Sequence, residues 1–550
     1  MRRCLYFLIK DRMTRLLLVA FISLGGISTS IASSYNEPTN YSHKIFKEAP
    51  KVSVDKKSGE LILELDVAYA QHQFTTFQNG ISVTKTLNLR SYNQQIVGPT
   101  IIARPGDTLK IHLTNSLPPE ENPMQCDADG HCNHNEPHNF NTTNLHFHGL
   151  HVDPGGISDN VMIRVAPDGE QYYEVHIPNN HVAGTFWYHT HVHGAASVQV
   201  GSGMAGALII RGDYDEVKEI DKAKEKIIML QEIAFDDNGE IENNDTYGPF
   251  AWTDEAEARG WHVSLNGQVM PTIKARPGEM QLFRFIHGGV RKNIELNIID
   301  ACNPSKPLKL TQIAADGISF TKKRVSNTGS VFMAPGYRSD VMIKLKKRGM
   351  YYLVDSADGW DMSLSEQYCD RKSDKLTLDS SAQHILARIE VGGKHVNGKY
   401  PKDNALFSLN RPKPITDEEL SPNVEYVEFD IDISVDPWVG LMNGKPYDPN
   451  IPRVLTLNTA QTWKISSVFS HHPFHIHVNP FEVIIRENGE IVDRYWKDTI
   501  LVDQHDTVQG INKTMELRMR YEDFSGEFVA HCHILDHEDH GMMEKIVIVP

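Results

Sequence analysis

The segment around Cys532 combines residue types that bind a soft metal ion at short spacing. Cys532 lies between His531 and His533, and His537 and Met542 follow closely. On a β-strand, successive side chains point to opposite faces, so the two flanking histidines share one face and Cys532 has the other. A cysteine, two histidines and a weakly bound methionine are the ligands of a blue copper centre. Taken alone, the segment also fits a small zinc site or a buried thiol beside solvated histidines.

Four pairs of histidines, each separated by one residue, extend this pattern through the chain. They are His146/His148, His189/His191, His475/His477 and His531/His533. Alternation along a strand directs both members of a pair to one place. Eight imidazoles exceed the four ligands of structural zinc. They favour a cluster of several copper ions, because copper binds imidazole well. His472, three residues before His475, is the remaining histidine for the Cys532 site.

The elements that must position these residues have the pattern of β-strands. Apolar side chains alternate with others over residues 61–67, 109–113, 427–433 and 515–519. A period of two indicates strands with one buried face. Pro-Gly, Asn-Gly and Asp-Gly steps between such stretches are typical of turns. We therefore expect an all-β protein built of mainly antiparallel sandwiches or barrels.

An internal repeat predicts the number of domains. Residues 99–107 recur as 271–279, and residues 264–267 are echoed by 441–444. Repetition of this kind indicates a repeated structural unit, so the sequence predicts three consecutive β domains. Their predicted boundaries are 45–213, 214–395 and 396–550.

The repeat also separates the domains by chemistry. Residues 184–191, which contain the His189/His191 pair, align with 526–533, which contain His531/His533. The equivalent stretch of the middle domain, 349–355, has no histidine. The first and third domains are therefore expected to carry the metal chemistry, and the second to be a copper-free spacer.

Residues 1–32 have the composition of an export signal. Basic residues precede a largely apolar run at 16–25, and Ser-Ile-Ala at 30–32 is a small-x-small cleavage site. The run is too short to span a bilayer. We expect a periplasmic or secreted protein without stable membrane insertion. A twin-arginine start at Arg2 and Arg3 leaves the export route open.

Charge and cysteines constrain the partners and the compartment. The net charge of -16 argues against a nucleic-acid partner, because phosphate binding needs a basic face. Disulfides persist in an exported protein, and Cys126 with Cys132 and Cys302 with Cys369 are possible pairs. The loop 126–138 is either a polar loop closed by a disulfide or an auxiliary copper site.

Together, the histidine pairs, His472 and the Cys532 segment resemble the multicopper oxidases of the bacterial laccase and cuprous-oxidase type, in order and across the whole chain. The resemblance implies three cupredoxin-like domains, each a Greek-key β-sandwich or barrel. It also implies four copper ions: one of type 1, one of type 2 and a type 3 pair. The implied type 1 ligands are His472, Cys532, His537 and Met542. The implied type 2 ligands are His146 and His475, and those of the type 3 pair are His148, His189, His191, His477, His531 and His533.

The mechanism that the resemblance implies needs protons as well as electrons. Electrons enter at the type 1 copper and reach the cluster through Cys532 and its two neighbours. Reduction of dioxygen to water consumes protons, so carboxylates near the cluster are needed as relays. Glu538 matches the acidic relay of the family. Asp159 matches a second one, for which Asp153 competes.

The sequence thus predicts an exported, copper-dependent oxidoreductase. Its expected partners are dioxygen and a reductant, either a phenol or aromatic amine or a reduced metal ion such as Cu(I) or Fe(II). The alternative is an exported copper-binding or copper-resistance protein with little turnover. Oxygen uptake on adding a reductant distinguishes the two.

Overall fold

The computed structural model describes residues 41–42, 44–78, 81–128, 132–235, 241, 262–357, 369, 375–376, 384–435, 437–505 and 513–550. The predicted export signal, 1–32, lies outside the described residues. Within them, no helix is both long and apolar enough to cross a membrane.

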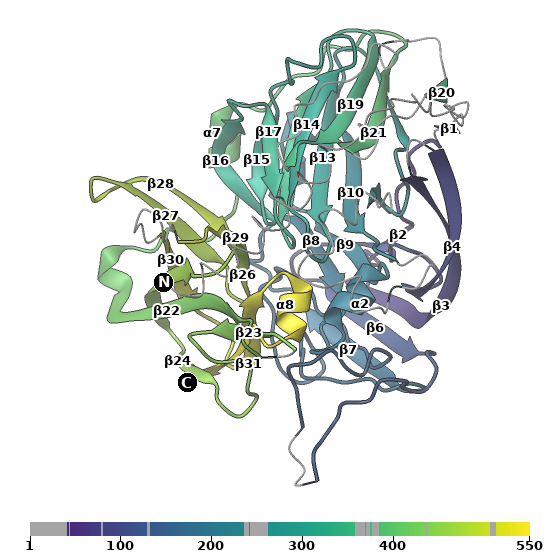
Figure 1. The fold of residues 1–550 in the computed structure, drawn as a ribbon. Helices are drawn as coiled ribbons and strands as arrows, with labels where there is room; N and C mark the ends of the chain where they lie inside the picture. Colours follow the sequence, from purple (N-terminus) through teal and green to yellow (C-terminus); the bar gives the residue numbers. More distant parts are fainter. Residues whose placement is uncertain are drawn as a thin grey trace, which may run out of the picture. The chain divides into compact units, whose positions relative to one another are not determined.

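The predicted all-β architecture is confirmed. Six sheets pair into three sandwiches along the chain, coloured from purple through teal and green to yellow in Figure 1, and a small sheet pairs two short strands. The small sheet joins β1 (Tyr41–Ser42) to β20 (Lys375–Leu376). A separate apolar core fills each sandwich. The domain boundaries themselves stay predictions.

The first sandwich contains the first two histidine pairs. One of its sheets has the order β4-β3-β6-β7 and the other β2-β5-β9-β8. The strands are β2 (Lys51–Ser53), β3 (Glu60–Gln78), β4 (Ile81–Tyr92), β5 (Thr100–Ala103), β6 (Thr108–Asn115), β7 (Glu170–His176), β8 (Gly184–His189) and β9 (Ala205–Ile210).

The middle sandwich has sheets of order β11-β10-β13-β18-β15-β16 and β12-β21-β19-β14-β17. Its strands are β10 (Lys224–Glu232), β11 (Val263–Leu265), β12 (Thr272–Ala275), β13 (Met280–His287), β14 (Ile294–Asp300), β15 (Thr311–Ala315), β16 (Ile318–Val325), β17 (Ser330–Met333), β18 (Arg338–Lys344), β19 (Gly349–Asp355) and β21 (Ile385–Val391).

The third sandwich has sheets of order β23-β22-β25-β30-β27-β28 and β24-β32-β31-β26-β29. Its strands are β22 (Leu420–Asp432), β23 (Val439–Met442), β24 (Arg453–Thr456), β25 (Thr459–Ser467), β26 (His472–Ile476), β27 (Phe481–Glu487), β28 (Glu490–Lys497), β29 (Thr499–Val502), β30 (Thr514–Tyr521), β31 (Gly526–Cys532) and β32 (Met543–Val549).

The described helices are short and connect strands. They are α2 (Ala196–Gly201), α3 (Asp213–Glu216), α4 (Lys218–Asp221), α7 (Asp403–Phe407), α8 (Leu535–Asp539) and the 3-10 turn η4 (Asp417–Glu419). Helix α8 begins directly after β31 and packs against α2 of the first sandwich. It therefore brings the segment that follows Cys532 to the first domain.

Alternation of side chains explains the strands, and strand β6 shows it most clearly. Leu109, Ile111 and Leu113 are buried, whereas the residues between them are half-buried. Burial of each such side chain favours folding by about 1.5–3 kcal/mol. The predicted alternation therefore corresponds to the two faces of the strand, one packed in the core and the other nearer the surface.

Each sandwich also contains a parallel strand pair at an equivalent position. These pairs are β3 with β6, β10 with β13 and β22 with β25. The sequence predicted mainly antiparallel sheets and did not predict these pairs. In each pair the two strands are separated along the chain by one neighbour in the same sheet and one strand of the other sheet, so the chain returns to the first sheet in its original direction.

Candidate metal centre

Equivalent strand positions carry the histidines in the first and third sandwiches. In the first, His146 and His189 exchange two backbone hydrogen bonds, with N–O distances of 2.8 and 3.0 Å. In the third, His475 of β26 lies opposite His531 of β31. The internal repeat therefore places two strands with the same histidine pairing in two domains.

The eight paired imidazoles converge between these two domains. All are buried. The Nε2 atom of His191 lies 3.1 Å from Nε2 of His531 and 3.2 Å from Nε2 of His477. In another contact between the two domains, Nε2 of His533 lies 3.3 Å from Nδ1 of His148. The ligand atoms of His146, His148 and His189 all lie within 4.8 Å of one another, as do those of three further groups: His146/His475/His477, His191/His477/His531 and His148/His475/Asp498.

Hydrogen bonds at the outer nitrogens fix the rings of the cluster. The Nδ1 atom of His146 lies 3.0 Å from Oδ1 of Asp159, and Nδ1 of His475 lies 2.8 Å from the Asp498 carbonyl oxygen. Likewise, Nδ1 of His189 lies 2.7 Å from the Thr190 carbonyl oxygen. In each case the Nδ1–H on the outer side of the ring donates, so Nε2, the inner nitrogen that faces the other imidazoles, is left with a free lone pair.

These inner nitrogens have no protein partner. Nε2 of His146, His189 and His475 is buried without a hydrogen bond. A buried polar atom without a partner is costly, and burial lowers the pKa of all three rings well below the ordinary value. Neutral imidazoles with converging lone pairs are ligands for a metal such as copper. The residues therefore fit the implied copper.

Cys532 lies on the opposite side of strand β31. Its Sγ atom is 3.9 Å from Nδ1 of His537, and the rings of His537 and His472 are 5.1 Å apart between centroids. The Met542 N–H donates to the His537 carbonyl oxygen at 2.9 Å, and the Cys532 N–H donates to the Met542 carbonyl oxygen at 3.0 Å. These bonds hold the backbone of Met542 beside those of Cys532 and His537.

The donor chemistry of this second group also fits copper. His472 has its Nδ1 atom 2.9 Å from the Ser467 hydroxyl, while its Nε2 atom is buried without a partner. Burial raises the pKa of the Cys532 thiol far above the ordinary value. The thiolate therefore forms here only when a cation such as a metal replaces the proton.

Both predicted relay carboxylates lie beside the imidazoles. Oε2 of Glu538 is 3.2 Å from Nδ1 of His531, and Oε1 is 3.4 Å from Nδ1 of His191. Burial raises the pKa of Glu538 and that of Asp159 to about 7 each. Asp153, the competing candidate, is exposed and accepts a hydrogen bond from the Gly155 N–H at 2.8 Å.

Several residues at the site were missed by sequence reasoning. Asp539 accepts hydrogen bonds from the N–H groups of Gly194 at 2.8 Å and Ser197 at 2.9 Å, and it thereby ties α8 to the start of α2. Asp498 and Thr499 both contact His148. No local spacing marks these residues, since their partners lie far away in the sequence.

The two possible disulfides are present. Cys126 is bonded to Cys132, and Cys302 to Cys369. In the same loop, Nδ1 of His138 lies 2.7 Å from the Glu136 carbonyl oxygen. The loop 126–138 is therefore closed by a disulfide, and its residues 129–131 lie outside the described residues.

Comparison with known proteins agrees with this geometry. Two family models, both described as multicopper oxidase, match residues 132–215 and 420–550. A multicopper oxidase of Staphylococcus aureus is 25% identical over 470 residues, which is 84% of either chain. A laccase of Bacillus stratosphericus is 24% identical, covering 84% of this chain and 91% of its own. A solved multicopper oxidase of Campylobacter jejuni, described as a metallo-oxidase, is 25% identical with a TM-score of 0.67, covering 92% of this chain and 96% of its own.

The two matched segments contain all eight paired histidines, His472 and Cys532. The chain belongs to the multicopper oxidase family. Members of this family are copper-dependent oxidoreductases that use dioxygen, and this chain is such an enzyme.

Proposed function

We propose that the enzyme couples the one-electron oxidation of a small reductant to the four-electron reduction of dioxygen to water. The single observation that carries this proposal is the set of buried imidazole nitrogens that have no protein partner and converge between the first and third domains. The alternative of a copper carrier explains metal binding alone. It does not explain two adjacent ligand groups flanked by buried acids.

The assignment of ligands is part of the proposal. Four side chains would hold the type 1 copper: His472, Cys532, His537 and Met542. His146 and His475 would hold the type 2 copper. The type 3 pair would be held by His148, His189, His191, His477, His531 and His533. The opposite orientation of Cys532 relative to its two neighbours supports this division into two groups.

Copper bound at these positions supplies one-electron redox chemistry. The protein connects the two groups through the main chain, because Cys532 is covalently bonded to both His531 and His533. Electrons would enter on the side of β31 that carries Cys532, and dioxygen would be reduced on the side that carries the imidazoles.

Glu538 and Asp159 would supply protons to this reaction. A carboxyl group with a pKa of about 7 carries a proton in part of the molecules at neutral pH and gives it up readily. Glu538 touches His191 and His531, whereas Asp159 holds Nδ1 of His146. The two acids therefore lie at different imidazoles of the cluster.

The reductant would be a phenol, an aromatic amine or a reduced metal ion. The His472 ring is fully buried, so a reductant does not contact it directly. Trp438 offers a route instead, because it is half-buried, stacks on His540 at 4.1 Å and meets the edge of His537 at 5.5 Å. The net charge of -16 favours cationic reductants.

Export to the periplasm or the medium belongs to the same proposal. Two disulfides suit an oxidising compartment, and the composition of residues 1–32 suits an export signal.

The decisive experiment measures copper content, visible absorption and oxygen uptake on the purified, copper-loaded protein. We expect four coppers per chain, a blue colour, and oxygen uptake on adding 2,6-dimethoxyphenol, Cu(I) or Fe(II). Comparing kcat/KM for the three reductants identifies the substrate class. Bound copper with no oxygen uptake from any reductant would favour the carrier.

A further inference from the structure

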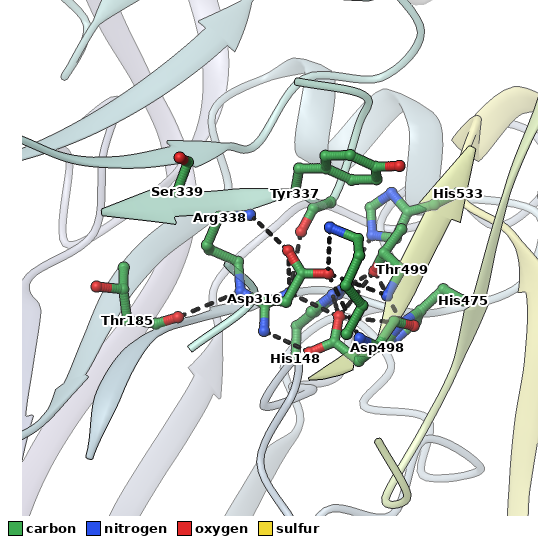
Figure 2. A network of polar contacts seen from close by, with 12 residues as sticks. His148, Thr185, Asp316, Tyr337, Arg338, Ser339, His475, Asp498, Thr499 and His533 are labelled. Carbon is green, nitrogen blue, oxygen red and sulfur yellow. Dashed lines mark hydrogen bonds and ion pairs between the residues drawn. The ribbon is translucent and has the colours of Figure 1, made fainter. Parts of the chain in front are cut away.

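One arginine of the middle domain reaches the copper cluster. Arg338 lies at the start of β18 and is buried. Its guanidinium forms a bidentate ion pair with the carboxylate of Asp498: Nη1 donates to Oδ1 at 2.7 Å, and Nη2 donates to Oδ2. Figure 2 shows this pair beside His148 and His475. A two-pronged contact fixes the plane of a carboxylate, which a single contact does not.

Asp498 passes this constraint to two imidazoles. Its Oδ1 atom lies 3.2 Å from Nε2 of His148, and its carbonyl oxygen lies 2.8 Å from Nδ1 of His475. The Thr499 hydroxyl lies 3.2 Å from the same atom of His148 and 3.1 Å from the same atom of His475. With Nε2 of His148 donating outward, its Nδ1 atom holds the lone pair and faces His533.

Arg338 also donates hydrogen bonds to the first domain and within its own middle domain. Nη1 also donates to the Gly336 carbonyl oxygen at 3.1 Å, and Nε donates to the Thr185 carbonyl oxygen of β8 at 3.3 Å. The side chain thus contacts all three sandwiches. Two hydrogen bonds besides the pair with Asp498 therefore hold it in place.

Asp316, an acid of the middle domain, connects Arg338 to the main chain next to Asp498. Oδ1 of Asp316 accepts the Arg338 N–H at 3.0 Å. Oδ2 accepts the Thr499 N–H at 3.2 Å and pairs with Nζ of Lys497 at 2.9 Å. The main chain around Asp498 is therefore clamped to the middle domain on both sides of the ion pair.

Two glycines leave room, one for this contact and one for the His533 ring. Gly149, next to His148, has φ +86, and a side chain there would overlap Nη2 of Arg338 and Oδ2 of Asp498. Gly336 also has φ +86, and its added Cβ would come within 2.9 Å of the His533 ring. Both backbones approach the cluster as closely as only glycine allows.

We propose that Arg338 is a positioning residue for the copper cluster, acting through Asp498. By fixing the Asp498 carboxylate, it holds the His148 ring with Nδ1 toward the metal and steadies His475 through the adjacent main chain. The middle domain then contributes the orientation of ligands that it does not itself carry. This inference rests on the proposed function, because it requires His148 and His475 to bind copper.

The test compares two buried arginines of the same domain. Arg338→Met removes the grip on Asp498. Arg284→Met is the matched control, because Arg284 is equally buried and pairs with Asp340, Glu225 and Asp215. Within the described residues, none of the contacts of these three acids reaches an imidazole of the cluster. The measurements are copper affinity by chelator competition, copper per chain, the blue absorption of the Cys532 site, and the unfolding temperature without copper.

We expect Arg338→Met to weaken cluster copper affinity about 10–100-fold, as loss of a group that orients ligands does. Its blue absorption per chain should stay at the wild-type level, since the Cys532 group lies on the other face of β31. Arg284→Met should lower the unfolding temperature and keep four coppers. Equal loss of stability in both variants, with full copper affinity in both, would mean that Arg338 only joins the domains.

Two further variants apply if Arg338→Met does not fold. Arg338→Lys keeps the charge but loses the two-pronged contact, so we expect an intermediate copper affinity. In the Asp498→Asn background, replacing Arg338 by Lys should have little further effect on copper affinity, because the two residues act in series. Fully additive losses would overturn the inference. A wild-type protein without blue colour or with fewer than four coppers would contradict the proposed function itself, whereas a four-copper wild type with an unaffected Arg338→Lys protein contradicts only this inference.

Discussion

The two faces of strand β31 meet different chemistry. The face with His531 and His533 meets six other imidazoles and the carboxyl of Glu538, and it is steadied by an ion pair between two domains. The face with Cys532 belongs to the apolar core of the third sandwich, beside Phe474 and Met542. In the proposed reaction, the side that would consume protons is bordered by carboxyl groups, and the side that would only pass electrons is enclosed by apolar side chains. Adjacent residues of one strand serve both.

The largest expected effect comes from a substitution on the face of β31 that carries Cys532, which we call the sulfur face. The face with His531 and His533 is the imidazole face. Cys532→Ser replaces a soft thiolate with a hydroxyl that copper binds poorly. We expect complete loss of the blue colour and of oxidase activity, with three of four coppers retained by the imidazole face. Absorption spectra and copper analysis check this. A blue and active variant would overturn the distinction between the two faces.

The second prediction breaks proton supply on the imidazole face. Glu538→Gln keeps the shape but removes the proton donor, so dioxygen turnover should fall about 100–10,000-fold. The blue colour should remain, and a reductant should still bleach it without oxygen. Stopped-flow reoxidation measures the loss.

A matched control for that variant lies in the middle domain. Burial also raises the pKa of Glu232 to about 7, and this carboxyl accepts the Arg291 N–H at 3.2 Å. Glu232→Gln should leave turnover unchanged. If it slows turnover as much as Glu538→Gln does, loss of any buried acid has the same effect and the relay role fails.

The third prediction concerns pH. The Glu538 carboxyl has a pKa raised to about 7, so its proton is present below that pH and is lost above it. Bound copper ions lower this midpoint, because positive charge favours the carboxylate. Turnover with ferrocyanide, which carries no proton to the reaction, should therefore fall up to about tenfold per unit as pH rises through neutrality. Glu538→Gln should give a flatter profile, and identical slopes would assign the titration to another group.

The smallest expected effect comes from a substitution that changes the reduction potential of the Cys532 site without removing its copper. Met542→Leu is nearly volume-conserving and should cost less than about 1.5 kcal/mol of stability. Loss of the weak axial ligand should raise the reduction potential of the type 1 copper, while cluster copper stays unchanged. Redox titration of the blue absorption measures the shift. A lower potential would contradict the axial role.

The sequence predicted those parts of the site that depend on local spacing. The histidine pairs and the Cys532 segment are readable because alternation along a strand decides which side chains share a face. His148 and Asp498 are 350 residues apart, and Arg338 and Asp498 are 160 residues apart. Such contacts depend on how three sandwiches pack, which a local pattern does not contain. The middle domain was therefore predicted as a spacer, although it holds Arg338 and Asp316 against the cluster.

The fold shows the same limit. Alternating burial and the internal repeat predicted strands and three β domains. The parallel pairing of β3 with β6 was not predicted, because alternation shows which face of a strand is buried and says nothing about its neighbour.

The division of the imidazoles between the first and third sandwiches has a consequence for biosynthesis. His191, the last histidine of the first two pairs, is translated 340 residues before His531. A nascent or prematurely terminated polypeptide therefore presents half a cluster, with too few ligands to retain several copper ions. Loading of the cluster therefore requires that the first and third domains have both been synthesised and have docked, and shorter chains do not carry a half-assembled redox centre.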